Sequence, residues 1–126
     1  MTKNFSIKEF ECRSECETPK DVYSNIIKLV AQLQYLRDYI DKPIKINSGY
    51  RCQEYNAKIG GVKRSQHILG KAADIRVDGM KPKEVHSIIE ELISKGEMLQ
   101  GGLGLYSSFV HYDVRGKKAR WDFSKR

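Results

Sequence analysis

The spacing of apolar residues changes along the chain, and this change constrains the fold more than any other feature. Between residues 22 and 40, and again between 85 and 93, apolar residues recur every three or four positions, which predicts two helices that each bury one face. In the segments 73–77 and 110–115 they alternate with polar residues, which predicts strands. Helices in the first part and strands grouped near the end together predict an α+β domain.

The strands of the C-terminal part are closely spaced. Segments 103–106, 110–115 and 119–123 are separated by short turns rich in serine, glycine and lysine, which predicts an antiparallel meander. A short strand is predicted at 44–46. Thr18 is the expected N-cap of the first long helix, with Pro19 at its first position. The expected fold is therefore a small antiparallel sheet packed with two main helices.

The length bounds the number of domains. A chain of 126 residues, 40% hydrophobic and 31% charged, is enough for one domain with a core, and we expect a single, monomeric domain over 1–126. No apolar run approaches the roughly 18 residues of a membrane span, so we expect no membrane insertion. The basic start has no apolar segment behind it, so we expect synthesis in the cytoplasm without a signal peptide.

The chain is basic, with 23 Lys and Arg against 16 Asp and Glu and a net charge of +7. Such a balance suits polyanionic partners such as nucleic acid, anionic lipid or an anionic cell-wall polymer, although a solvated basic surface is the favoured explanation. Because no basic helix, RNA-binding signature or zinc-finger spacing is present, we expect no nucleic-acid partner.

Three cysteines, Cys12, Cys16 and Cys52, cannot all pair within one chain. The spacing from Cys12 to Cys16 is that of half a metal clip, but no second Cys/His pair with finger spacing follows it. Reduced thiols are therefore favoured over a disulfide framework.

Candidate metal ligands lie on the polar faces of two predicted strands. In 110–115, alternation places His111 and Asp113 opposite the apolar residues, and in 73–77 it does the same for Asp74. His67 lies seven residues before Asp74. Two neutral imidazoles and one carboxylate suit zinc with an open position for water. Scattered histidines are more often surface residues, so this pattern alone leaves the metal open.

The wording and order of four segments indicate a family of proteins. These segments are Ser48-Gly49-Tyr50-Arg51, Ser65-Gln66-His67, Gly70–Ile75 and Val110–Arg115. Together they closely resemble the zinc D-Ala-D-Ala carboxypeptidases, a group that includes small peptidoglycan peptidases of bacteria and phages and the L-alanyl-D-glutamate endolysins. The resemblance covers roughly residues 5 to 123. It implies a zinc peptidase domain with the zinc site on its sheet, in a fold shared with hedgehog signalling domains.

The resemblance also implies roles for individual residues. His67, Asp74 and His111 match the ligands of one zinc ion. Arg51 matches an arginine beside the metal, where a permanent cation stabilises a developing oxyanion. Ser65 matches a polar position near the bound peptide, and capping of its own loop accounts for this serine equally well.

One position departs from the resemblance. Many relatives carry the general base three residues before the last ligand histidine, where this chain has Ser108, a side chain that accepts no proton at neutral pH. The nearest carboxylate on the correct face is Asp113. Two roles remain open for Asp113: it is the catalytic base, or it orients a ligand imidazole from behind.

The expected function is therefore hydrolysis of a peptide bond in the stem peptide of bacterial peptidoglycan, as a D-Ala-D-Ala carboxypeptidase or an L-Ala-D-Glu endopeptidase. The expected place of action is the cell wall, after phage-type release or delivery. The alternative is an inactive zinc-containing binding or phage structural module of the same fold, as hedgehog domains illustrate. The sequence does not fix which bond is cut.

Overall fold

The computed structural model describes residues 2–12, 18–61 and 65–124. Its helical elements are η1 (Ile7–Phe10), α1 (Lys20–Ile40), α2 (Gln53–Lys58), η2 (Gln66–Leu69) and α3 (Pro82–Ser94). Its strands are β1 (Ile44–Ser48), β2 (Ala72–Val77), β3 (Gly102–Leu105), β4 (Val110–Asp113) and β5 (Ala119–Asp122). Within the described ranges, no helix combines the length and apolar character that a bilayer crossing requires.

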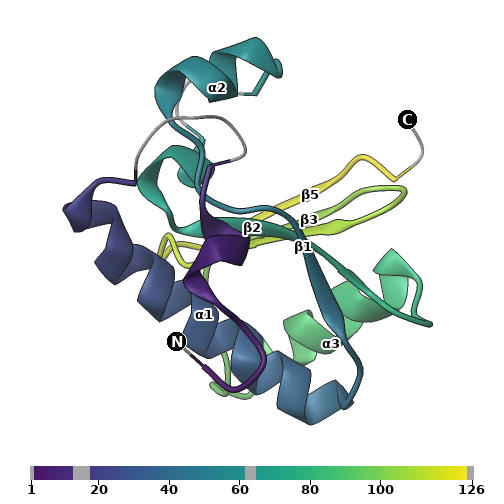
Figure 1. The fold of residues 1–126 in the computed structure, drawn as a ribbon. Coiled ribbons are helices and arrows are strands. Elements are labelled where there is room, and N and C mark those ends of the chain that lie inside the picture. The colour runs from purple at the N-terminus through teal and green to yellow at the C-terminus, as the bar shows by residue number, and fades with distance from the viewer. Residues whose placement is uncertain (1, 13–17, 62–64, 125–126) are drawn as a thin grey trace.

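The five strands form one mixed sheet in the order β1-β2-β4-β3-β5. Neighbouring strands run antiparallel except β3 and β5, which are parallel. Helices α1 and α3 lie on one side of the sheet, and α2 projects on the other (Figure 1). The prediction of an α+β fold in one small domain is confirmed.

The core lies between the sheet and the two long helices. The apolar stripes that the sequence shows in α1 and α3 face inward, and alternate residues of β2 and β4 meet them. Burial of these stripes removes apolar surface from water, which is the main stabilising contribution to such a fold. The larger buried apolar side chains from these elements are Val22, Ile26, Leu29, Val30, Leu33, Leu36, Ile75, Val77, Val85, Ile89, Leu92, Ile93, Val110 and Tyr112.

The predicted C-terminal meander is wrong in its last strand. The pair β3–β4 is antiparallel as expected, but β5 pairs in parallel with β3 and not with β4. The reason is that β2 already occupies the other edge of β4, so the only edge left for β5 at this end of the sheet is that of β3. The sheet is consequently mixed rather than antiparallel.

Three local features also differ from the sequence predictions. Helix α2 was not anticipated, since its six residues are too few to show a helical period. Residues 66–69 form a short 3-10 helix within a segment expected to be a loop. Pro19, not Thr18, occupies the N-cap of α1, which begins at Lys20.

Candidate metal centre

The pairing of β2 with β4 brings two of the predicted ligands together. Asp74 and His111 are direct partners across this antiparallel pair, on the face opposite the core. His67 joins them from η2, which ends in Gly70 at a left-handed φ of 72° before the chain enters β2. A side chain at Gly70 would also collide with Val22 of α1, so glycine serves both the turn and the close packing there.

The three side chains form one buried group. His67 Nε2 and His111 Nδ1 each lie 3.2 Å from the same oxygen of Asp74, Oδ1. One ligand atom from each of the three residues falls within 4.8 Å of the others, as binding of a single metal ion requires. Among the described residues, this is the only cluster of three or more His, Cys, Asp or Glu side chains with that geometry.

Hydrogen bonds behind the two imidazoles fix which nitrogen faces the centre. His67 Nδ1 lies 2.8 Å from the Gly49 carbonyl, which only accepts, so Nδ1 carries the proton. His111 Nε2 lies 2.7 Å from Asp113 Oδ2 and donates to that carboxylate. The nitrogens left facing Asp74 are therefore acceptors when the rings are neutral, and three acceptors converge on one point. A bound cation would remove this repulsion.

The carboxyl groups of Asp74 and Asp113 both have pKa values lowered by their surroundings. Without a metal ion, burial alone raises the pKa of Asp74, but the ring nitrogens of His111 and His67, which donate to Asp74 when they carry a proton, outweigh burial and hold the pKa of this carboxyl well below its usual range. The pKa of Asp113 is likewise low, because hydrogen bonds from His111, Arg115 and the Gly102 amide outweigh its burial. Both side chains are anionic at neutral pH.

Asp113 lies behind His111, on the side away from the group. It is fully buried, and besides His111 it accepts hydrogen bonds from the Gly102 amide at 2.7 Å and from Arg115 Nη2 at 2.7 Å. A side chain at Gly102 would occupy the place of this carboxylate. Both oxygens of Asp113 are thus engaged within the protein.

The segment from Ser48 to Arg51 contacts both His67 and Asp74. Arg51 donates from Nη2 to Asp74 Oδ2 at 3.1 Å, from Nε to Ser48 and from Nη1 to Asn56. The neighbouring Gly49 packs against the backbone of Phe10, where an added Cβ would approach to 2.8 Å. The glycine therefore allows the close contact that also directs its carbonyl to His67.

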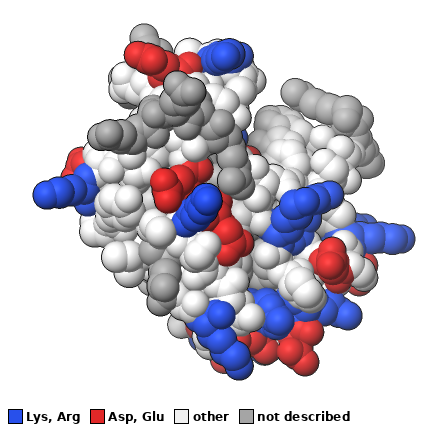
Figure 2. Space-filling view, in the orientation of Figure 1, with Lys and Arg blue, Asp and Glu red and all other residues white. Residues whose placement is uncertain are grey.

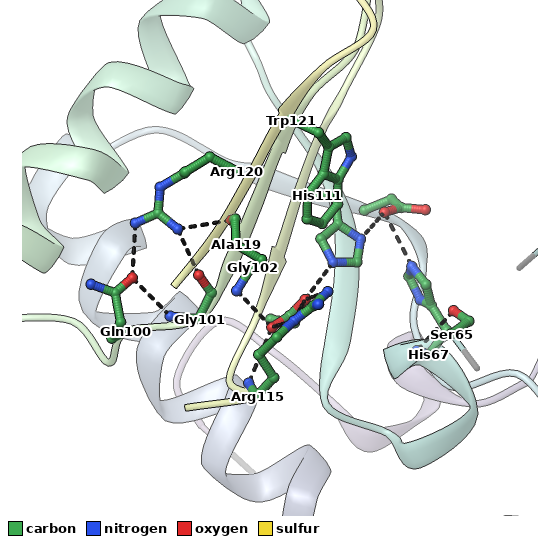
Figure 3. A network of polar contacts seen from close by, with 12 residues as sticks. Ser65, His67, Gln100, Gly101, Gly102, His111, Arg115, Ala119, Arg120 and Trp121 are labelled. Carbon is green, nitrogen blue, oxygen red and sulfur yellow. Dashed lines mark hydrogen bonds and ion pairs between the residues drawn. The ribbon is translucent and has the colours of Figure 1, made fainter. Parts of the chain in front are cut away.

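A cleft of about 470 Å³ opens above this group. Trp121 of β5 forms part of its wall, with its ring centroid 4.9 Å from that of His111 (Figure 3). The indole reaches this position because Gly104, its neighbour on β3, has no side chain to obstruct it. The cleft is lined by Arg51, Gly60, Gly61, Ser65, Gln66, His67, Asp74, Tyr106, Phe109, His111, Arg115, Trp121 and Phe123.

The remaining predicted residues are placed as follows. Ser65 lines the cleft but is buried, and its Oγ accepts the His67 amide at the start of η2, which is the capping role. Ser108 is exposed in the β3–β4 turn and is not part of the cleft lining. Cys16 lies outside the described residues, whereas the sulfurs of Cys12 and Cys52 are 3.8 Å apart.

Sequence reasoning assigned no role to Arg115 or Trp121, although both line the cleft. A signal for Arg115 was present, because it alternates with His111 and Asp113 on one face of the strand. For Trp121 the signal was the pair Gly102 and Gly104, which leaves one face of β3 without side chains. The two glycines point to Trp121 only when the pairing of β5 with β3 is known, and the sequence does not show that pairing.

The fold and this group define a protein with a buried His-Asp-His candidate metal centre on the floor of an open cleft. Comparison with known families agrees: the model of the family described as Peptidase M15 matches residues 3–113. The chain therefore belongs to the peptidase M15 family.

Two curated relatives illustrate the similarity. The zinc D-Ala-D-Ala carboxypeptidase of Streptomyces albus G is 38% identical over 53 residues, covering 41% of this chain and 21% of that protein. The peptidoglycan L,D-endopeptidase MepK of Escherichia coli K12 is 33% identical over 87 residues, covering 64% of this chain and 44% of that protein. The chain thus spans less than half the length of these relatives.

Proposed function

We propose that this chain is a zinc-dependent peptidase that hydrolyses a peptide bond in the stem peptides of bacterial peptidoglycan. The observation that carries the proposal is the convergence of His67, Asp74 and His111 on one point at the cleft floor. Membership of the M15 family and the activities for which its relatives are named support the same conclusion. Action at the cell wall, after phage-type release or delivery, stays a prediction from the sequence.

The donor set fits zinc. Two imidazole nitrogens and one carboxylate are ligands typical of catalytic zinc sites, and hydrogen bonds to Gly49 and Asp113 already orient both rings. When bound, zinc would supply Lewis-acid polarisation of a substrate carbonyl and a water of lowered pKa. His67, Asp74 and His111 would hold it.

The chain's own residues act around that ion. Arg51 keeps Asp74 in place through Oδ2 and presents a fixed positive charge at the cleft, where it would stabilise an oxyanion that develops on the substrate. We infer that Asp113 takes the second of the two roles that the sequence left open: it orients His111. Its full burial and its bonds to Gly102 and Arg115 support this role over that of a base.

One observation favours a second candidate function, a zinc-bearing binding module without turnover. Among the described residues that line the cleft, Asp74 is the only carboxylate, and Ser108 stands at the position where the family resemblance implies a general base. A peptidase needs a proton acceptor within hydrogen-bond reach of the reacting water, or one water away. The two candidates therefore differ in turnover and not in metal content.

Mass spectrometry of digested muropeptides separates the two candidates. The zinc-loaded protein is incubated with muropeptides that carry complete stem peptides, and product masses identify the cleaved bond. We expect the parent to release D-alanine or to cleave within the stem. The Asp74→Ala variant should show no such cleavage, and the surface control Asp78→Ala should cleave as the parent does. Intact muropeptides with a zinc-loaded parent would contradict the peptidase and leave the binding module.

A further inference from the structure

Among the residues that the structure describes, two arginines line the cleft, and they differ in how many N–H donors of the guanidinium group remain unpaired. Each nitrogen of Arg51 already donates one hydrogen bond, to Ser48, Asn56 or Asp74, so only a single N–H on Nη1 and another on Nη2 are left for an oxyanion. Arg115 donates from Nε and Nη2 to Asp113, but its Nη1 donates to no residue that the structure describes. Since a guanidinium carries five N–H donors in a planar fork, the outer edge of Arg115 stays open.

Arg115 is also held in a fixed position. Its side chain is 28% exposed, it forms a two-pronged pair with buried Asp113, and its Cζ lies 5.5 Å from the centroid of the Trp121 ring. Figure 3 shows this guanidinium beside the network that contains His111. A cation that is already ordered loses little conformational entropy when it binds a ligand.

The charge of the cleft favours an anion at this edge. Asp74, the one carboxylate among its described lining residues, is paired with Arg51, and Asp113 is buried behind His111. The two 2.7 Å contacts from Arg115 to Asp113 and from Asp113 to His111 keep the guanidinium near the candidate ligands. A carboxylate on the residue after the scissile bond lies about one residue length, 3.3–3.6 Å, beyond that bond, within a cleft that Arg115 lines together with the candidate ligands.

We infer that the outer edge of Arg115 binds a carboxylate on the substrate residue that follows the scissile bond. The inference rests on the proposed function and names its substrate class: stem peptides with a free carboxylate at that residue. The C-terminal carboxylate of a D-Ala-D-Ala peptide and the α-carboxylate of a D-Glu residue both supply this group. Arg pairs well with such planar anions because two parallel N–H donors match two oxygens.

The test compares matched pairs of peptides. One pair is a stem peptide ending in D-Ala-D-Ala, as the free acid and as the C-terminal amide. The other contains L-Ala-D-Glu, with the D-Glu α-carboxyl free or amidated. The value of kcat/KM is measured with zinc-loaded parent, Arg115→Gln and Lys117→Gln, the last being an exposed cation of the adjacent turn that controls for the lost charge.

We expect parent and Lys117→Gln to prefer the acid of one pair by about 10–100-fold, the scale of a hydrogen bond to a charged group. In Arg115→Gln this preference falls to near one. Because Arg115 also supports Asp113, its loss lowers the rates on acid and amide together, so only the ratio reports carboxylate binding. The peptide pair that is hydrolysed shows whether the carboxylate is that of a C-terminal D-alanine or the α-carboxylate of D-Glu.

A parent that cleaves acid and amide equally, or an Arg115→Gln variant that keeps the preference, would overturn the inference while the peptidase stands. A parent that cleaves none of the peptides refutes the proposed function instead. Calorimetric binding of the same pairs then decides: a tenfold preference for the acid that Arg115→Gln loses supports the inference, and equal binding overturns it.

Discussion

Arg51 is held more tightly than a simple surface cation, since each nitrogen of its guanidinium has a different partner. Lysine at this position keeps the charge but loses the planar fork. We predict that Arg51→Lys lowers kcat/KM by about 10²-fold, the scale of a lost oxyanion donor, with zinc content and fold unchanged. Arg76→Lys, an exposed arginine on β2, is the control. Full activity of Arg51→Lys would show that Arg51 is structural only.

Asp113 acts, in this account, through His111. We predict that Asp113→Asn weakens zinc affinity about 10–100-fold, because the imidazole loses its charged acceptor. Turnover should return toward the parent value when zinc is saturating. A base would behave in the opposite way, with unchanged zinc affinity and a loss of about 10²-fold or more at saturating zinc. Measurement of zinc affinity beside turnover distinguishes these results, and Asp78→Asn in an exposed turn is the control.

At the scale of elements, strand β3 has glycine at both positions of one face, Gly102 and Gly104, and this leaves room for the Trp121 indole in the wall of the cleft. An added Cβ at Gly104 would collide with the Trp121 indole, which packs beside His111. We predict that Gly104→Ala costs about 1–3 kcal/mol of unfolding free energy, as overpacking does. Because Trp121 is the only tryptophan, its fluorescence reports the displacement directly. Unchanged emission and stability, equal to those of the exposed control Ser108→Ala, would refute this packing role.

Helix α3 and strand β5 are joined by a two-pronged ion pair. Arg120 Nε and Nη2 each lie 2.8 Å from an oxygen of Glu90, and the hydrogen bond from Arg120 lowers the pKa of Glu90 (Figure 3 shows the other bonds of Arg120). A lowered pKa means that this stabilisation is present above the unfolded pKa, about 4.3, and is lost as pH falls through the folded pKa.

We therefore predict that Glu90→Gln lowers the unfolding free energy by about 0.5–1 kcal/mol at pH 7, since the pair is partly exposed. The difference between parent and variant should disappear in acid, below the folded pKa of Glu90. Denaturant titrations at neutral and acidic pH measure both values. A difference that is the same at the two pH values would contradict the ion-pair account.

At the scale of the whole molecule, the net charge of +7 is distributed rather than focused. Basic and acidic side chains are interspersed over the face that Figure 2 shows. This distribution is that of a solvated surface with weak attraction to polyanions, which salt screens over about 8 Å at physiological ionic strength. The specific chemistry therefore has to come from the cleft.

Much of the fold was predictable because apolar periodicity is a local signal. The apolar pattern predicted α1, α3, β2 and β4. The alternation within the two strands also predicted that Asp74 and His111 lie on their polar faces. It did not show that these two residues face each other, because register between strands depends on contacts distant in sequence. The parallel position of β5 was missed for the same reason.

The central claim is that His67, Asp74 and His111 together hold zinc, and elemental analysis of the purified protein tests it most directly. The third histidine, His86 on α3, provides a matched control, since the chain has only three. We predict one zinc per chain in the parent and in His86→Ala, and loss of zinc in both His67→Ala and His111→Ala. Zinc content equal to that of the parent in both ligand variants would contradict the assignment.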